Sequence, residues 1–221
     1  MLFKDLIEKN SAQWDNYIHH AFVKKLQDGS LPKEVFLFYL KQDYLFLLHY
    51  AKAYATLALN ATNANELRFA MKFQNAIING EIELHKNILQ LGIDTKELSI
   101  KDESLTTIAY TRYVLNVGQS GDFLDMLIAL SACAIGYGYI GTEMIASIDE
   151  KTLHHHPYKE WILTYSSQEF QTEIKEFEDF VNSYQRQINT TKFNRLNEIF
   201  YTAVRLETAF WEHSMKMQMD F

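Results

Sequence analysis

The stretch LDMLIALSACAIGYGYIGTE, residues 124–143, decides the fold class of this 221-residue chain. It is apolar, almost free of charge, and crowded with small residues around the only cysteine, Cys133. We expect such a run to form a helix in the middle of the protein, with a neighbouring helix or a ligand close to its backbone. On this helix Tyr137 follows Cys133 by one turn, so the phenol and the thiol share a face. A simpler interpretation is a core helix in which Cys133 is only a small buried hydrophobe.

The composition favours long helices around this stretch. A chain of this length can form one large domain or two small ones, with a sizeable core. Two prolines and eight glycines supply few of the turns that a many-stranded sheet needs. Apolar residues instead recur at helical spacing. The sequence therefore predicts an all-α bundle in a single domain, residues 1–221, with helical segments at about 2–27, 32–61 (with Pro32 in the first turn), 64–91, 104–118, 121–143, 157–181 and 190–217.

Charge and hydropathy exclude several classes of protein. The formal net charge of −7, without a Lys/Arg cluster, argues against a nucleic-acid partner. A single cysteine excludes an intrachain disulfide and fits a reducing cytoplasm, and the charged, amphipathic N-terminus is unlike a signal peptide. The uncharged run Met126–Thr142 is at the lower limit of the roughly 17–25 residues that span a bilayer. Its glycines, serine and tyrosines favour a buried helix, so we expect a soluble, cytoplasmic protein without a membrane partner.

Histidines offer weak candidates for metal or haem sites. His154–His156 are consecutive and point in different directions, which favours a solvated loop over a metal site. Glu81 and His85 are four residues apart on a polar helix, where a plain surface pair is the simpler interpretation. A ferritin-like di-iron site needs Glu-x-x-His pairs, which this chain lacks. His19 or His20 could ligate a haem axially, although a helix-end histidine packing near Phe22 is the more ordinary account. We therefore expect no metal.

Two carboxylates in apolar surroundings are stronger candidates for a ligand site. Asp43 lies among aromatic and aliphatic residues on a helix with little polar surface there, and Glu207 lies in a similar setting near the C-terminus. A buried carboxylate must find hydrogen-bond donors or change its protonation state. Each alone is more typical of a structural hydrogen bond. Together with one cysteine and many tyrosines, they indicate a pocket for a flat, polar, aromatic ligand.

These residues resemble the TenA family, also called thiaminase II or aminopyrimidine aminohydrolase. Six motifs occur in family order over nearly the whole chain, each weak alone and specific together. They are His20-x-Phe22-Val23 with Asp28-Gly-x-Leu-Pro32, Gln42-Asp43, Tyr110-Thr111, Cys133-x-x-x-Tyr137, Trp161-Ile-x-Thr-Tyr165, and Glu207-x-x-Phe210-Trp211.

The resemblance implies a fold, an activity and a set of residue roles. It implies a haem-oxygenase-like bundle that assembles as a homotetramer and works without a metal, a haem or another cofactor. Its reaction would be hydrolysis of 4-amino-5-aminomethyl-2-methylpyrimidine to the hydroxymethylpyrimidine of thiamine salvage. Cys133 would be the nucleophile, Glu207 would move protons, and Asp43 would bind the aminopyrimidine edge. The implied pocket walls are Tyr110 and Phe210, which would stack on the ring, and the polar Tyr137 and Tyr165.

Two details of this resemblance lead to expectations of their own. An ionised Glu207 beside Cys133 would disfavour a thiolate, so we expect Glu207 to accept the thiol proton as attack occurs, with the pair titrating as a unit. Where many members carry a tyrosine three residues after the aspartate, this chain has Phe46. The lost hydroxyl, worth about 1 kcal/mol if it met a buried polar group, bears on how intact thiamine is handled relative to the amine-bearing pyrimidine.

Two other functions remain open. A non-catalytic, pyrimidine-binding or regulatory member of the same fold would not need the thiol, and the set of Asp43, Cys133 and Glu207 argues against it. A haem-binding protein of similar architecture would depend on His20.

Overall fold

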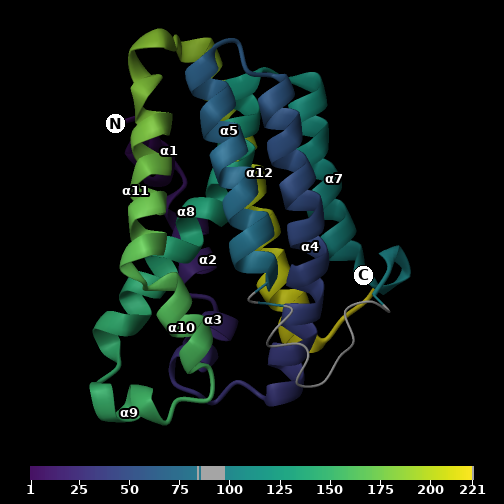
Figure 1. The fold of residues 1–221 in the computed structure, drawn as a ribbon, viewed down its shortest axis with the longest axis vertical. Coiled ribbons are helices and arrows are strands. Elements are labelled where there is room, and N and C mark those ends of the chain that lie inside the picture. Colours follow the sequence, from purple (N-terminus) through teal and green to yellow (C-terminus); the bar gives the residue numbers. More distant parts are fainter. Residues whose placement is uncertain (84, 86–97, 221) are drawn as a thin grey trace. The chain divides into compact units, whose positions relative to one another are not determined.

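The computed structural model describes residues 1–83, 85 and 98–220. Within these ranges the regular structure is helical and no strand occurs (Figure 1). The predicted all-α class is therefore confirmed. The helices are α1 (Leu2–Lys9), α2 (Ser11–Ile18), α3 (Ala21–Gln27), α4 (Lys33–Leu59), α5 (Ala64–Ala76), α7 (Leu105–Ser120), α8 (Phe123–Ser147), α9 (Glu150–His154), α10 (Lys159–Tyr165), α11 (Gln168–Ser183) and α12 (Thr190–Lys216), with short helical turns η1 (Ile77–Glu81), η3 (Ile100–Asp102) and η4 (Gln185–Gln187).

The helices fall into two compact units, which we describe separately. Unit 1 comprises Met1–Leu31 and Ile128–Thr208, and unit 2 comprises Pro32–Leu127 and Ala209–Phe221. The division falls within the sequences of α8 and α12. A single domain over residues 1–221 stays a prediction.

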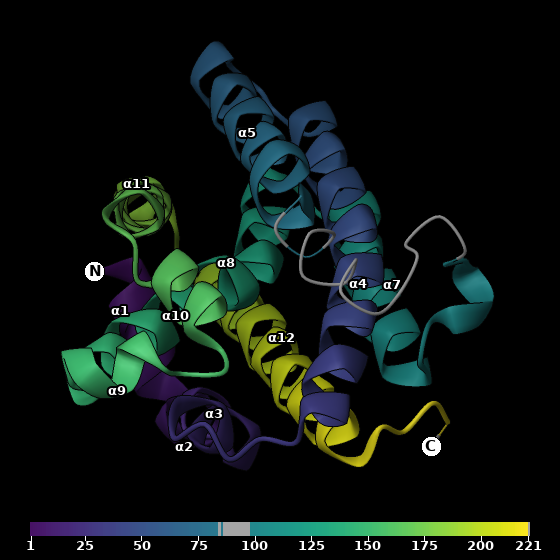
Figure 2. The same cartoon turned by 60° about the horizontal axis from the view of Figure 1, so that its bottom comes forward.

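Unit 2 is built around α4, which packs against α5 and α7 (Figures 1 and 2). Helix α4 begins directly after Pro32, which is its N-cap and does not lie in the first turn as the sequence suggests. Proline fits there because its missing N–H would have no partner within the helix. Asn63 caps α5 by accepting hydrogen bonds from the main-chain nitrogens of Asn65 and Glu66. Ser104 caps α7 in the same way through the nitrogen of Thr107.

A π turn follows α5 and changes which residues are buried. The predicted helix over 64–91 leaves α-helical geometry at η1, where the nitrogen of Ile82 donates to the oxygen of Ile77. A π turn inserts one residue into the helical register. The buried positions of α5 recur every three or four residues up to Ile77 and resume at Ile82 and His85. The remainder of that predicted helix, with its expected end at Gly92, lies outside the described residues.

The N-terminal part of unit 1 is divided into three helices where the sequence suggests one helical segment over 2–27. The first break falls at Asn10, whose side-chain nitrogen donates to the oxygen of Leu6 at 2.8 Å and to Oδ1 of Asn197 at 2.9 Å. The second falls at His20, which caps α3 by accepting a hydrogen bond from the nitrogen of Phe22 at Nδ1. The ordinary account of His20 as a helix-end residue is therefore confirmed.

Helix α8 is a core helix whose glycines are explained by packing within unit 1. A Cβ at Gly136 would lie 2.4 Å from the ring of Tyr17, and one at Gly141 would lie 2.4 Å from the main-chain oxygen of Tyr165. Neighbouring protein, and not a ligand, therefore approaches the backbone at these two positions. The helix is long and apolar enough to cross a membrane, but 89% of its most apolar window is buried inside the protein. Such burial is typical of a core helix.

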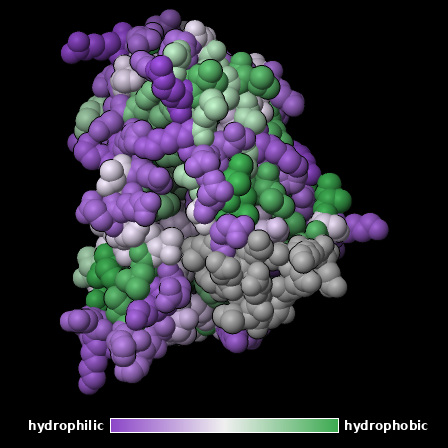
Figure 3. Space-filling model, in the orientation of Figure 1, coloured by the Kyte–Doolittle hydropathy of each residue, from purple (hydrophilic) through white to green (hydrophobic). Residues whose placement is uncertain are grey.

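The surface carries an apolar stripe on one helix. Hydrophilic residues predominate on the face in Figure 3, with hydrophobic residues gathered among them. On α5 and η1, Leu67, Met71 and Ile78 are 42%, 58% and 44% exposed. Their spacing of four and seven places them on one side of a helix, although the π turn begins between Met71 and Ile78.

Candidate functional site

The polar centre of unit 2 is the Asp43 carboxylate on α4. Its side chain is 5% exposed and accepts two hydrogen bonds at Oδ2, from the Tyr39 hydroxyl at 2.8 Å and from Nε2 of His85 at 2.7 Å. Tyr39 is one helical turn before Asp43, whereas His85 comes from the segment that follows the π turn. The expectation that a buried Asp43 must find donors is confirmed.

The sequence prediction for His85 is wrong. His85 is completely buried and is not half of a surface pair with the Glu81 side chain. Its Nδ1 instead lies 2.8 Å from the main-chain oxygen of Glu81. Burial lowers the pKa of His85, but the charge of Asp43 and the hydrogen bonds with Asp43 and Glu81 act in the opposite direction and raise it overall. The π turn explains the error, because it moves the buried stripe onto His85.

Aromatic rings gather in unit 2 near this carboxylate. The ring of Tyr39, which donates to Asp43, lies 6.2 Å from that of Phe210. Phe46 lies 4.8 Å from Tyr110 and 5.9 Å from Phe210, centroid to centroid. Phe46, Tyr110 and Phe210 are each at most 3% exposed. Unit 2 thus brings four of the predicted binding residues together: Asp43, Phe46, Tyr110 and Phe210.

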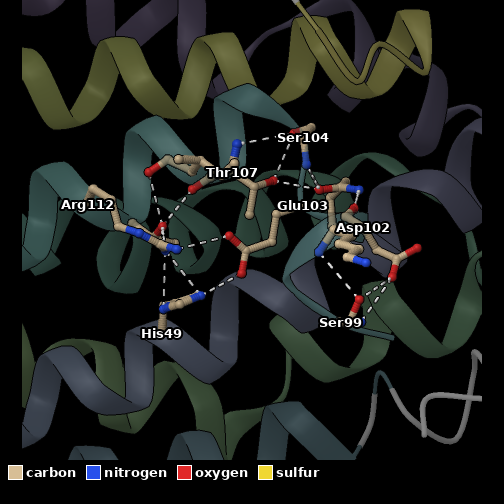
Figure 4. Close-up of polar contacts among 11 residues, drawn as sticks. His49, Ser99, Asp102, Glu103, Ser104, Thr107 and Arg112 are labelled. Atoms are coloured by element: carbon tan, nitrogen blue, oxygen red, sulfur yellow. Dashed lines mark hydrogen bonds and ion pairs between the residues drawn. The ribbon is translucent and has the colours of Figure 1, made fainter. Parts of the chain in front are cut away.

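Gln42 fixes the segment that leads into α7. Its Oε1 accepts hydrogen bonds from the nitrogen of Ser104 at 2.8 Å and the hydroxyl of Thr107 at 2.7 Å. Its Nε2 donates to the main-chain oxygen of Asp102 at 2.8 Å. Figure 4 shows these partners around the start of α7. Because α7 carries Tyr110, these hydrogen bonds of Gln42 also set the position of Tyr110 relative to α4.

A second histidine–carboxylate contact lies beside these hydrogen bonds of Gln42. Nε2 of His49 is 2.7 Å from Oε1 of Glu103, and Oε2 of Glu103 is 3.3 Å from Nη2 of Arg112 (Figure 4). The Glu103 side chain is 3% exposed, that of His49 15%, and that of Arg112 39%. These contacts tie α4, α7 and the segment before α7 to one another.

The remaining predicted site residues lie in unit 1. Cys133 is 8% exposed on α8, and Tyr137 is buried one turn later. The ring of Tyr137 lies 5.0 Å from that of Tyr165, which in turn lies 4.4 Å from that of Trp161. Tyr165 is the last residue of α10, and Ser167 caps the next helix, so the chain breaks between α10 and α11 at Ser166-Ser167.

Glu207 is also buried, at 2% exposure, on α12. Its pairing with the thiol of Cys133 stays a prediction. Unit 1 therefore holds the predicted nucleophile and proton carrier, whereas the predicted ring-binding residues around Asp43 belong to unit 2.

The sequence suggests a solvated loop for the three consecutive histidines, but they are not uniformly exposed. His154 ends the short helix α9, and His154 and His155 are exposed. His156 is 8% exposed, with Nε2 3.1 Å from the main-chain oxygen of Gln27 and Nδ1 accepting from the nitrogen of Tyr158. His156 therefore holds local structure. Across residues 1–83, 85 and 98–220, no three His, Cys, Asp or Glu side chains are grouped to hold a metal ion.

Curated relatives match the chain over most of its length. An aminopyrimidine aminohydrolase of Halalkalibacterium halodurans is 34% identical over 216 residues, covering 97% of this chain and 95% of that protein. An aminopyrimidine aminohydrolase of Helicobacter pylori is 33% identical over 211 residues, covering 94% of this chain and 95% of that protein.

Solved structures match the fold. A protein of Silicibacter sp. TM1040 described as a TenA family transcription regulator superposes with a TM-score of 0.89 at 35% identity, covering 97% of this chain and 96% of that chain. A Shewanella denitrificans domain with a heme oxygenase-like fold superposes with a TM-score of 0.74 at 16% identity, covering 97% and 92%. The expected haem-oxygenase-like architecture is confirmed. The model of the TENA/THI-4/PQQC family matches residues 8–217, and the chain belongs to this family.

Proposed function

We propose that the protein hydrolyses 4-amino-5-aminomethyl-2-methylpyrimidine to 4-amino-5-hydroxymethyl-2-methylpyrimidine in thiamine salvage. The observation that carries this proposal is the match, at 34% identity over 97% of the chain, to a relative named for this activity. The buried Asp43 carboxylate among aromatic rings supports it, because such a group suits a flat ligand with an amino donor.

In this mechanism Cys133 supplies covalent catalysis. Its sulfur forms a bond to a pyrimidine ring carbon, and Glu207 accepts the thiol proton as that bond forms. The electrons pushed into the ring expel the amine from the adjoining methylene, and the amine takes up a proton as it leaves. Water then adds to the methylene and loses a proton, the carbon–sulfur bond breaks, and the thiol is restored. The net reaction exchanges the amine for a hydroxyl.

The other site residues bind the ring. Asp43 accepts a hydrogen bond from the aminopyrimidine edge, and Tyr110 and Phe210 stack on the ring faces. Tyr137 and Tyr165 supply polar wall groups. No metal or other cofactor takes part, so dialysis against a chelator is expected to leave the activity unchanged.

The test is release of the hydroxymethylpyrimidine by wild type and by Cys133→Ser. The variant is expected to lose essentially all turnover and to keep its fold, because the replacement differs by one atom. Ser131→Ala is the matched control on the same helix, since among the described residues the Ser131 hydroxyl donates within its own helix, to the oxygen of Ile128. Full activity of Cys133→Ser would exclude the covalent mechanism.

Glu207→Gln tests the proton transfer separately. The amide cannot accept the thiol proton, so we expect a loss of about 100-fold or more in kcat, the usual contribution of general acid–base catalysis. Normal turnover by this variant would exclude the assigned role.

We extend the proposal to the cleavage of thiamine into hydroxymethylpyrimidine and thiazole, with Phe46 adjusting the preference. Phe46 packs between Tyr50, at 5.2 Å, and Tyr110, at 4.8 Å. A hydroxyl added by Phe46→Tyr would place a new donor in this aromatic group. We expect the ratio of the two activities to change, and an unchanged ratio would show that position 46 only packs.

A regulatory, non-catalytic role is the alternative, and it is favoured by the similarity to the Silicibacter protein, which is described as a transcription regulator. Binding of the hydroxymethylpyrimidine without turnover of either substrate would select this alternative. Loss of hydroxymethylpyrimidine binding in Asp43→Ala would then still indicate that the ligand binds at Asp43.

We also propose that the protein is a cytoplasmic homotetramer. The exposed stripe of Leu67, Met71 and Ile78 supports assembly, because a second copy would cover these apolar side chains. Light scattering after size-exclusion chromatography is expected to give four times the 25.9 kDa chain mass. Met71→Glu should lower this mass if the stripe lies in a contact, and cell fractionation checks the compartment.

A further inference from the structure

The buried histidine of unit 2 has an acceptor at each ring nitrogen. Nδ1 of His85 lies 2.8 Å from the main-chain oxygen of Glu81, and Nε2 lies 2.7 Å from Oδ2 of Asp43. A main-chain carbonyl oxygen can only accept a hydrogen bond, so Nδ1 must carry a hydrogen. This contact fixes the tautomer of His85.

The second contact requires one further proton. With Nδ1 protonated, a neutral imidazole would turn a bare Nε2 lone pair towards a carboxylate oxygen at 2.7 Å. Two acceptors at that distance repel each other unless a proton lies between them. The proton belongs to the pair and resides on either His85 or Asp43.

The surroundings favour its residence on His85. The Tyr39 hydroxyl donates to the same Oδ2 at 2.8 Å, which stabilises the charged form of the carboxylate. The pKa of His85 is raised, because the charge of Asp43 and the hydrogen bonds with Asp43 and Glu81 outweigh the opposing effect of burial. The pair is then an imidazolium and a carboxylate, with no net charge.

This charge state restricts what Asp43 can recognise. Among the described residues, both recorded hydrogen bonds of Asp43 end on Oδ2, which leaves Oδ1 as its second acceptor oxygen. An ionised carboxylate has no hydrogen to donate. It can bind the N–H of a 4-amino group, but it repels the oxygen of a 4-oxo group at the same ring position. A protonated Asp43 could donate to that oxygen.

We propose that His85 is a specificity-determining residue, which holds Asp43 as a carboxylate so that the protein selects 4-aminopyrimidines over 4-oxopyrimidines. This inference rests on the proposed function for the class of ligand, a pyrimidine. His85 acts through Asp43 and is therefore a positioning residue. Its charged state follows from the contacts within unit 2, independently of any ligand.

The ligand test compares two unreactive pyrimidines. Calorimetry measures the Kd of 4-amino-2,5-dimethylpyrimidine and of its 4-oxo analogue, which carry the same two methyl groups, for wild type, His85→Leu and His85→Gln. Wild type should prefer the amino compound by about 100-fold or more, because a site built for an N–H donor strongly rejects a mismatched group. In His85→Leu we expect this preference to fall at least about 10-fold. In His85→Gln the amide can still donate to Asp43, so part of the preference should return.

His49→Gln is the matched control, because His49 also meets a buried carboxylate in unit 2, that of Glu103. It should keep the wild-type preference. An unchanged preference in both His85 variants would overturn the proposal. A loss of affinity for both ligands by the same factor would also overturn it, because that result indicates only a structural role.

Nuclear magnetic resonance tests the charge without any ligand. In protein with ¹⁵N-labelled histidine, the His85 ring should still show two protonated nitrogens at about pH 7, above the pKa of roughly 6.5 of a free imidazole. Asp43→Asn removes the charge that holds this proton, so its His85 signal should be that of a neutral ring. A neutral His85 in wild type at that pH would overturn the proposal even in an active enzyme. If wild type bound neither pyrimidine but its His85 was charged, the proposed ligand class would be overturned. The ion pair of His85 and Asp43 would still be established.

Discussion

His85 in unit 2 and His19 in unit 1 have nearly the same contacts and very different surroundings. Each places both ring nitrogens within 2.7–2.8 Å of an oxygen: His85 meets Asp43 and the main chain of Glu81, and His19 meets Asp15 and Glu143. The His85 side chain is fully buried, whereas that of His19 is 40% exposed and its two carboxylates are 74% and 50% exposed. Distance alone therefore does not distinguish the two clusters.

Burial makes the difference, because it removes the alternative of hydrogen bonding to water. An exposed histidine can leave its carboxylate at little cost, and salt screens the attraction. A buried carboxylate has no such alternative, and removal of its partner leaves an uncompensated charge. The contact of His49 with Glu103 is intermediate, because Glu103 is buried and Arg112 is more than one-third exposed. From His19 through His49 to His85, water can replace the histidine–carboxylate hydrogen bonds progressively less well.

The largest effect is expected from removal of the buried carboxylate. Asp43→Ala leaves His85 and the Tyr39 hydroxyl without their common acceptor and opens a cavity. We expect a loss of about 3–5 kcal/mol in the free energy of unfolding, the range for breaking a buried ion pair. Urea denaturation followed by circular dichroism measures it. Asp15→Ala is the control in the exposed cluster, with an expected loss of about 0.5 kcal/mol or less, and equal losses in the two variants would remove the distinction.

The sequence predicts the helices of this protein better than it predicts His85. Pro32, Asn63 and Ser166-Ser167 mark their boundaries through local chemistry, which a short window of sequence contains. The burial of Cys133 follows from the apolar run around it. The π turn at Ile77–Glu81, by contrast, inserts one residue without a clear signal in the local sequence. The inserted residue determines which side chains after the turn face the core. No helical periodicity calculated across the turn could have placed His85 inside.

The partners of buried polar groups are hard to predict for a related reason. Asp43 is recognisable as a carboxylate in need of donors, and Tyr39 lies one turn away, within the reach of a helical pattern. The other donor comes from a residue 42 positions later. His156 shows the same limit, because three adjacent histidines look solvated until the fold brings the oxygen of Gln27 to one of them.

The intermediate cluster should give an intermediate effect. Glu103→Ala removes the acceptor of His49 and one acceptor of Arg112, and Arg112 can turn to water. We expect a loss of about 1–3 kcal/mol by the same denaturation measurement. Because these contacts hold the segment before α7, Glu103→Ala should also shorten the lifetime of protected amides there in hydrogen exchange. A loss as small as that of Asp15→Ala would show that burial of one partner is not sufficient.

The pH dependence of stability should separate the buried histidine from the exposed ones. The pKa of His85 in the folded protein is raised above the 6.5 of an unfolded chain. Its stabilising contribution is therefore fully present below pH 6.5 and is lost as the pH rises through the folded pKa. Among the described residues, the groups that face His85 are Asp43, the hydroxyl of Tyr39 and Glu81, and of these Asp43 supplies the main opposing charge. His85→Gln cannot titrate, so the stability of wild type should fall relative to this variant as the pH rises above about 6.5, by at most about 1.4 kcal/mol per pH unit for one proton. Parallel curves for the two proteins would show that His85 does not bind its proton more tightly when folded.

The smallest effect on the free energy of unfolding is expected for substitution of the exposed His19. Added salt should abolish this effect. Burial lowers the pKa of His19, but the hydrogen bonds with Asp15 and Glu143 and their charges together raise this pKa overall. The stabilising contribution of His19 is therefore present below pH 6.5 as well. At about pH 6 and low salt, His19→Gln should lower the free energy of unfolding by about 0.5 kcal/mol or less, because the cluster is solvated. At about 0.5 M salt the difference between variant and wild type should vanish, since the screening length then falls to a few ångströms. The loss caused by Asp43→Ala should persist at the same salt concentration, because ions do not enter the buried cluster. A salt-resistant effect at His19, or a salt-sensitive one at Asp43, would contradict the assignment of their difference to burial.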